Sequence, residues 1–140
     1  MKLQSQTCLL EQSQKLAELG VTAQSQCVHV LVGRFNPREC SVLPIKNICN
    51  TDDYIAILCQ AYTVAELLQA LPKSIGDYDL TIHNSSNHWF ISYVNFEFDY
   101  RAKHSASNDS LPQLLAVMLI YFLENNLLTA EQVNEAINNG

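Results

Sequence analysis

The chain has 140 residues, of which 48% are hydrophobic, and its 14 acidic and 8 basic residues give a formal net charge of -6. A chain of this length can bury a sizeable core without disulfides or bound metals. Because its charge repels phosphate backbones and anionic lipid head groups, the composition disfavours nonspecific binding to nucleic acids and to membrane surfaces.

The N-terminal segment predicts a helix over residues 8–19. Its leucines recur on roughly one face at helical spacing, and Gly20 follows at the position where a helix favours a left-handed residue. The leucines on this face are Leu9, Leu16 and Leu19.

A β-hairpin is predicted next. Residues 27–32 are rich in β-branched side chains and end at Gly33, and residues 41–45 can pair with them across the intervening loop. Pro44 has no amide hydrogen to donate, which places the second strand at a sheet edge. The apolar segment 54–59 suits either a buried strand or a helical turn, and the sequence leaves this choice open.

A second helix is predicted over residues 64–71. Thr63 and Glu66 form a capping-box pattern, in which the two side chains bond free backbone amides at the start of a helix, and Pro72 ends it. The helix is expected to bury Val64, Leu67 and Leu68.

The middle of the chain predicts three antiparallel strands. Residues 78–82 and 88–94 alternate between apolar and polar side chains on either side of a turn at 84–87, which indicates a hairpin. Residues 96–104 alternate again and form the predicted third strand. The turn into this strand lies near Asn95 or within the first four residues of the segment.

Both faces of this sheet carry apolar side chains. Trp89, Ile91 and Tyr93 share one face, which we expect the C-terminal helix to cover, whereas Phe90 and Val94 lie on the other. The first helix and the first hairpin are candidates to cover this second face.

The last long helix is predicted over residues 111–125. Ser110 is its N-cap, Pro112 is tolerated in the first turn, and Gln113 can return the capping bond. The helix is apolar on most sides, so other layers of this chain or a second subunit must cover its second apolar side, formed by Val117, Ile120 and Leu123.

The C-terminal part contains an apolar run and a short tail helix. Residues 114–123 are the longest apolar run, and ten residues are too few for a membrane span of about twenty. A short amphipathic tail helix begins after Thr129 and carries Val133 and Ile137 on its apolar face.

The cysteines point to a reducing compartment. The chain has 5 cysteines at irregular spacing and no apolar N-terminal stretch typical of a secretory signal, so we expect reduced thiols in a cytoplasmic protein. Cys27, His29 and Cys40 could supply soft metal ligands, but their spacing matches no zinc motif. His83 and His88 flank the hairpin turn without a third ligand, and no metal or cofactor is predicted.

The residue types of a hydrolase triad occur near the end of the third strand. His104, Asp109 and Ser110 are close in sequence, but Ser110 already has a structural role as a helix cap and no nucleophile-elbow motif is present. A small cysteine–histidine hydrolase is therefore the third hypothesis, and the sequence favours a role that is not enzymatic.

Two surfaces are candidates for binding. A nucleic-acid contact would use the cations of one loop and one strand, although cations in an acidic protein more often pair with surface carboxylates. A protein interface would use aromatic strand residues and the second apolar side of the last long helix. The candidate nucleic-acid residues are Arg34, Arg38, Arg101 and Lys103, and the candidate interface residues are Tyr93, Phe96, Phe98, Tyr100, Val117 and Ile120.

Three segments carry a resemblance to a known group of proteins. They are residues 10–21, residues 62–75, and residues 110–124 followed by Asn125 and Asn126. Together they resemble small proteins carried by prophages and mobile elements of Bacteroides-type bacteria, and the second half is similar to a phage helix–sheet–helix sandwich domain. The resemblance implies a layered α/β/α arrangement and a mobile-element origin, and it brings no activity or site residues with it.

The sequence therefore predicts an α+β fold in which an antiparallel sheet with three core strands packs between helices in an α/β/α-like sandwich. One domain spans residues 1–140, with an N-terminal helix and variable β region over 7–62, a helix–three-strand–helix core over 63–128 and a tail helix over 129–140. The leading functional hypothesis is a non-enzymatic accessory protein of a prophage or mobile element that binds another protein or a second copy of itself. The alternative is a weak nucleic-acid-binding module.

Overall fold

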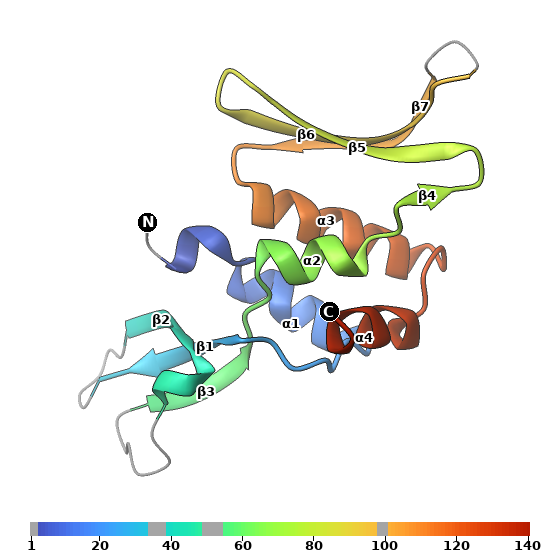
Figure 1. Ribbon diagram of the computed structural model, residues 1–140. Coiled ribbons are helices and arrows are strands. Elements are labelled where there is room, and N and C mark those ends of the chain that lie inside the picture. The colour runs from blue at the N-terminus through green and yellow to red at the C-terminus, as the bar shows by residue number, and fades with distance from the viewer. Residues whose placement is uncertain (1–2, 34–38, 49–54, 98–100) are drawn as a thin grey trace.

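The computed structural model describes residues 3–33, 39–48, 55–97 and 101–140, and within them the predicted α+β class is confirmed (Figure 1). The helices are α1 (Leu10–Glu18), α2 (Val64–Ala70), α3 (Leu111–Glu124) and α4 (Ala130–Asn138), with short 3-10 turns η1 (Leu3–Gln6) and η2 (Ile45–Asn47). The strands are β1 (Cys27–Val32), β2 (Glu39–Pro44), β3 (Ile55–Gln60), β4 (Ser74–Ile75), β5 (Tyr78–Ser85), β6 (His88–Asn95) and β7 (Arg101–Asn108).

The helix caps agree with the sequence. Thr63 and Glu66 form the predicted capping box at the start of α2, and Thr129 with Gln132 forms another at the start of α4. The Ser110 side chain accepts a hydrogen bond from the amide of Gln113 at the start of α3, as its sequence pattern indicates.

The larger sheet has the strand order β4-β5-β6-β7, and all its neighbours are antiparallel. The hairpin of β5 and β6 is confirmed, with its turn at Ser86 and Asn87. These two residues have left-handed φ values of 52° and 62°, as in the two-residue turns that match the twist of a hairpin.

The third strand of this sheet lies further along the chain than predicted. The sequence places it at residues 96–104, whereas β7 runs from Arg101 to Asn108. Phe96 and Glu97 belong to a turn, because the side-chain oxygen of Asn95 accepts a hydrogen bond from the Glu97 amide at 3.0 Å and bends the chain there.

A β-bulge interrupts β7. Ile91 pairs with Ala106 and Tyr93 with Lys103, so His104 and Ser105 together lie opposite a single residue of β6. His104 has a φ of 52°, and its ring lies 5.4 Å from that of Phe122 on α3 and 5.6 Å from that of Tyr121, measured between ring centres.

The smaller sheet has the order β2-β1-β3. The predicted first hairpin is confirmed, and β2 lies at an edge, as Pro44 indicates. The segment that the sequence leaves open forms β3, which pairs with the other side of β1. The strand β1 therefore has a neighbour on each side, and its first four residues are buried while its last two are half-buried.

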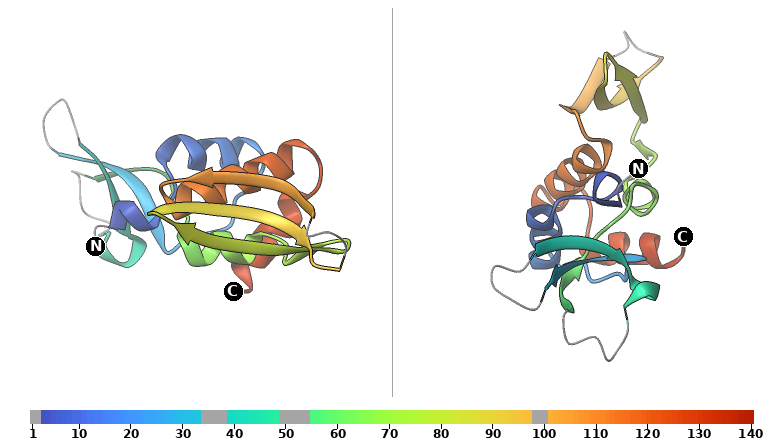
Figure 2. Two further views of the ribbon diagram at one scale, coloured as in Figure 1. Left: turned by 90° about the horizontal axis from the view of Figure 1, so that it is seen from above. Right: turned by 90° about the vertical axis from the view of Figure 1, so that its left-hand side faces the viewer.

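The helices lie between the two sheets, which differs from a sheet covered by helices on both faces. Figure 2 shows the four-stranded sheet at one end, the helices in the middle and the three-stranded sheet at the other end. In the described part of the chain α3 packs on β6 and β7, while α1 and the first hairpin do not cover the second face with Phe90 and Val94. These two side chains remain partly exposed.

The apolar helix α3 is covered mainly by its own chain. It packs against the four-stranded sheet on one side and against α1 and α2 on others. Of its predicted second apolar side, Leu123 is buried and Ile120 packs against the core, whereas Val117 is exposed. Among the described residues, no helix is long and apolar enough to cross a membrane.

Candidate functional site

A groove lies between β7 and α3. It contains a cavity of about 280 Å³, and its lining comes from three consecutive residues of the strand and one face of the helix. We call this the β7–α3 groove. The lining residues are His104, Ser105, Ala106, Val117, Met118 and Tyr121.

Both elements shape the groove through their local sequence. Val117 and Tyr121 are four residues apart and share a helical face, with the buried Met118 beside them. Opposite them, the bulge turns the His104 ring toward α3, and the small side chains of Ser105 and Ala106 leave space open.

The groove is apolar and open to solvent. Val117 and Tyr121 are each 43% exposed, although both are large hydrophobic side chains. The polar groups at its border are the His104 imidazole, the Ser105 hydroxyl and the Tyr121 hydroxyl. An apolar hollow with a few polar groups at its border is typical of a surface that binds a partner.

The strand beside the groove lies at the edge of its sheet. Its Arg101 and Lys103 are exposed, and the Lys103 ammonium lies 4.5 Å from the centre of the Tyr78 ring. Within the described ranges the ion pairs join Lys15 to Glu18 and His88 to Asp109, so neither cation of β7 has a carboxylate partner there. The edge is therefore a small basic strip in an acidic protein.

The structure divides the candidate interface residues. Tyr93 is a core residue whose hydroxyl donates a hydrogen bond to the Pro72 carbonyl at 2.7 Å, so it presents no surface to a partner. Phe96 is 53% exposed in the turn after β6. Val117 lines the groove, and Ile120 is partly buried against the core. Phe98 and Tyr100 lie outside the described residues.

The candidate nucleic-acid residues are only partly described. Arg34 and Arg38 lie outside the described residues. Arg101 and Lys103 are two residues apart on β7 and pair with Asn95 and Tyr93 of β6, so they share one side of the sheet. Of the four candidate nucleic-acid residues, the structure therefore brings Arg101 and Lys103 together.

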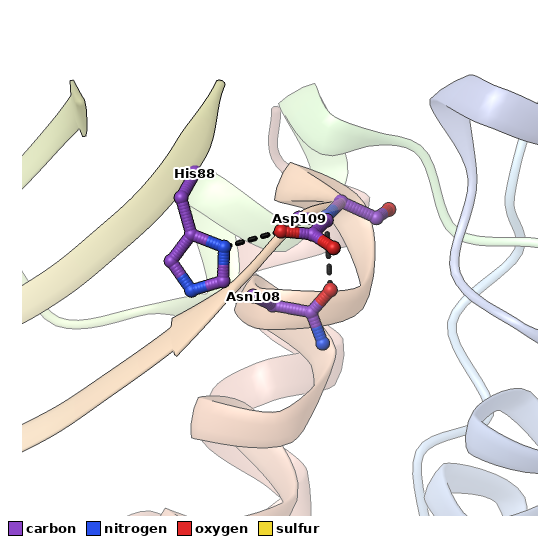
Figure 3. Close-up of polar contacts among 4 residues, drawn as sticks. His88, Asn108 and Asp109 are labelled. Carbon is purple, nitrogen blue, oxygen red and sulfur yellow. Dashed lines mark hydrogen bonds and ion pairs between the residues drawn. The ribbon is translucent and has the colours of Figure 1, made fainter. Parts of the chain in front are cut away.

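The hydrolase residues do not assemble as their sequence neighbourhood suggests. Asp109 bonds Nδ1 of His88, at the start of β6, and not His104 (Figure 3). The Ser110 hydroxyl accepts a hydrogen bond from a helix amide, and its own amide donates to the side chain of Asn108 at 2.9 Å. Because Asp109 is 87% exposed, its contact with His88 is a surface hydrogen bond between the hairpin and the residue before the N-cap of α3.

The histidines beside the hairpin turn are separated by an aromatic ring. His83 stacks on Phe90 with ring centres 5.0 Å apart, and His88 meets the same ring edge-on at 5.2 Å. Phe90 thus lies in contact with both imidazoles. Among the described residues, no group of three or more histidine, cysteine or acidic side chains is arranged to hold a metal ion.

A smaller cavity of about 150 Å³ lies between the N-terminal segment and the smaller sheet. His29 and Cys40 line it with Cys8, whereas Cys27 packs in a separate cluster, so the three soft ligands considered from the sequence do not share one cavity. Burial lowers the pKa of His29 and raises the pKa of the Cys8 thiol, and Nε2 of His29 has no hydrogen-bond partner in the described structure.

Sequence reasoning missed the groove because its signal is distributed. The sequence makes Val117 a candidate because it lies on the second apolar side of α3. Its neighbours His104, Ser105 and Ala106 reach the groove only because β7 is shifted and bulged. Comparison of the chain with protein-family models, with curated proteins and with solved structures gave no match.

Proposed function

We propose that this chain is a cytoplasmic, non-enzymatic accessory protein of a prophage or mobile element, and that it acts by binding another protein at the β7–α3 groove. The mobile-element origin is supported by the sequence resemblance. The reducing compartment is supported by the free thiols of the described cysteines, Cys8, Cys27, Cys40 and Cys59.

The observation that carries the binding function is the exposed apolar lining of the groove. Val117 and Tyr121 belong to a helix whose other apolar residues are mostly covered by the chain itself. Burying a fully exposed side chain of this kind contributes about 1.5–3 kcal/mol. Because 43% of each of these two side chains is exposed, a partner that covers them gains at most about half of that for each, and tyrosine and methionine are enriched at protein interfaces.

Photocrosslinking in cells of the bacterium that carries the gene tests this function. A benzophenone amino acid replaces Tyr121 in the groove or, as a matched control, Ile57, which is 55% exposed on β3 of the other sheet. We expect a defined protein adduct, identified by mass spectrometry, at position 121 but not at position 57. Adding Val117→Lys is expected to reduce the adduct at least about tenfold, because the ammonium would be desolvated in the contact.

Two results contradict this site. Equal adducts at positions 121 and 57 would indicate chance collisions rather than a binding surface. An adduct at position 121 that survives Val117→Lys would place the contact outside the groove.

A further inference from the structure

We infer that the groove binds a short extended peptide segment of the partner, which adds to the edge of β7 as a further strand, inserts one apolar side chain beside Val117 and places a carboxylate near Arg101. This inference rests on the proposed function and specifies its partner. It requires three properties of the site: an edge that can pair, a hollow of the size of one side chain, and a local positive charge.

The edge of β7 is suited to pairing over its second half. At the opposite edge of the sheet β4 has only two residues, whereas β7 has eight. Residues 105–108 of β7 have the sequence Ser-Ala-Ser-Asn, whose small side chains let another backbone approach. An extended peptide added to such an edge gains main-chain hydrogen bonds, and pockets beside the edge select its side chains.

The cavity next to this edge has room for a large apolar side chain. At about 280 Å³ it is smaller than the usual pockets for drug-sized ligands. Its apolar lining favours leucine, methionine or phenylalanine, and Met118 at its base has a flexible thioether that adapts to different shapes.

The charge of the strand selects a complementary peptide. Between Arg101 and Asn108 the strand has two cations and no acidic residue, although the whole chain has a net charge of -6. The Lys103 ammonium already lies over the Tyr78 ring, which leaves Arg101 as the cation for a peptide carboxylate. Since strands rise about 3.3 Å per residue, a peptide that spans both the groove and Arg101 needs about six to eight residues.

A second copy of this chain is a poor occupant. Symmetric pairing of two β7 strands would bring the cations of both copies, Arg101 and Lys103, to one seam. The regularly paired part that follows the bulge, residues 106–108, is three residues long. Stable interfaces bury about 1,200–2,000 Å² in total, far more than two such edges provide.

Selection from a displayed library of random ten-residue peptides, with the full chain as bait, tests the inference. We expect an enriched motif with one large apolar residue and a nearby acidic residue. The synthetic consensus peptide, measured by fluorescence anisotropy, should bind at least tenfold more weakly to Val117→Lys and to Tyr121→Lys. Arg101→Gln should weaken binding severalfold and reduce its salt dependence, whereas Lys73→Gln, also at an exposed cation, should not.

A separate experiment tests whether the bound peptide is an extended strand. Methylation of single backbone nitrogens of the peptide should weaken binding at alternate positions only, because a strand directs every second amide to its neighbour. Losses at every interior position would indicate a helical ligand and overturn the inference. Circular dichroism confirms that each variant is folded, and the two lysine variants at different positions guard against a local defect.

The failures of the two proposals are distinguishable. If no peptide is enriched while the crosslink at position 121 persists, the chain binds a folded surface and only the peptide inference falls. If light scattering shows a dimer of the free chain that Val117→Lys dissociates, the occupant is a second copy and the inference is wrong. Peptides that bind Val117→Lys as tightly as the unmodified chain also overturn it.

Discussion

His29 is a buried histidine whose protonation is coupled to the stability of the fold. It lies on the central strand of the smaller sheet, is 7% exposed, and its Nε2 has no hydrogen-bond partner in the described structure. Burial disfavours the imidazolium and lowers the pKa of His29 below its usual 6.5, although hydrogen bonding to the Cys8 backbone acts in the opposite direction. In the folded chain the neutral imidazole is therefore favoured.

A pH dependence of stability follows from this shift. Below pH 6.5 the unfolded chain binds a proton at His29 more readily than the folded chain does. Above pH 6.5 the imidazole is neutral in both states and does not lower stability. As the pH falls from 6.5 toward the pKa of His29 in the folded chain, the free energy of unfolding therefore decreases. The slope from one proton is at most about 1.4 kcal/mol per pH unit. Urea unfolding between pH 7.5 and 5.5 measures it.

His29→Gln should flatten this slope, whereas His83→Gln, at an exposed histidine, should leave it largely unchanged. A slope that persists in His29→Gln would assign the titration to another group. The comparison of slopes does not depend on the absolute stability of either variant.

At the scale of residues, contacts local in sequence were predictable and contacts across the sheet were not. The local sequence Ser-Leu-Pro-Gln predicts Ser110 as a cap, and the Gln113 amide donates to its hydroxyl. The pair of His88 and Asp109 depends on the pairing of Trp89 with Asn108, since each partner lies one residue beyond that pair. Only a sheet register could bring them together.

The helix α4 is fastened to the segment between α1 and β1 by one side chain. The Asn134 side-chain oxygen accepts hydrogen bonds from the amides of Thr22 and Ala23 at 2.8 and 2.9 Å, and its amide group donates to the Gly20 carbonyl at 3.1 Å. Residues more than one hundred positions apart are thus joined at one point. The packing of α4 on α2 adds to this attachment.

Asn134→Ala is expected to lower the free energy of unfolding by about 1–2 kcal/mol, because it removes three hydrogen bonds that water only partly replaces. Asn138→Ala makes the same chemical change at an exposed position of the same helix and should change stability by less than about 0.5 kcal/mol. Chemical denaturation of both variants measures the difference. Equal losses would show that the effect comes from the helix itself and not from the attachment.

At the scale of elements, the sequence predicts those that have both a periodic pattern and an end signal. The helix α2 has a capping box and a following proline, and the β5–β6 hairpin has alternation and a turn. The strand β7 lacks such a signal: its second half is Ser-Ala-Ser-Asn, with low β-propensity, and it forms because the partner strand β6 is eight residues long. The apolar alternation at residues 96–100 therefore misplaced its start.

For the whole molecule, the sequence predicted the α+β class but not the order of the layers. Apolar faces indicate that an element needs a cover, and they do not indicate which element provides it. The helix α3 is covered by α1, α2 and the larger sheet, whereas Phe90 and Val94 keep a partly exposed face. Which of these apolar faces is covered, and by which element, depends on contacts between residues distant in sequence, which periodicity does not encode.

The two ends of the molecule differ in the amount of apolar packing. Among the residues that the structure describes, the main cluster of buried side chains has 19 members, including Leu115 and Leu119 of α3. The second cluster that the described residues form, at the smaller sheet, consists of Cys27, Val42 and Ala61, and Val28 and Val30 of β1 are buried beside it. Because local opening costs less where fewer apolar contacts are lost, we expect the smaller sheet to open without unfolding of the rest.

Native-state hydrogen exchange measures this difference. Amides in the middle of α3 should exchange only through global unfolding, with a strong dependence on added denaturant, whereas amides of β3 should exchange at least about tenfold faster with little such dependence. Val42→Ala should accelerate exchange in the smaller sheet alone, while Leu119→Ala, in the main cluster, should accelerate it throughout and lower the free energy of unfolding by about 2–5 kcal/mol. If the amides of β3 and α3 exchange with the same free energy and the same denaturant dependence, the two clusters unfold as a single unit. The smaller sheet would then not open on its own, and the prediction would be wrong.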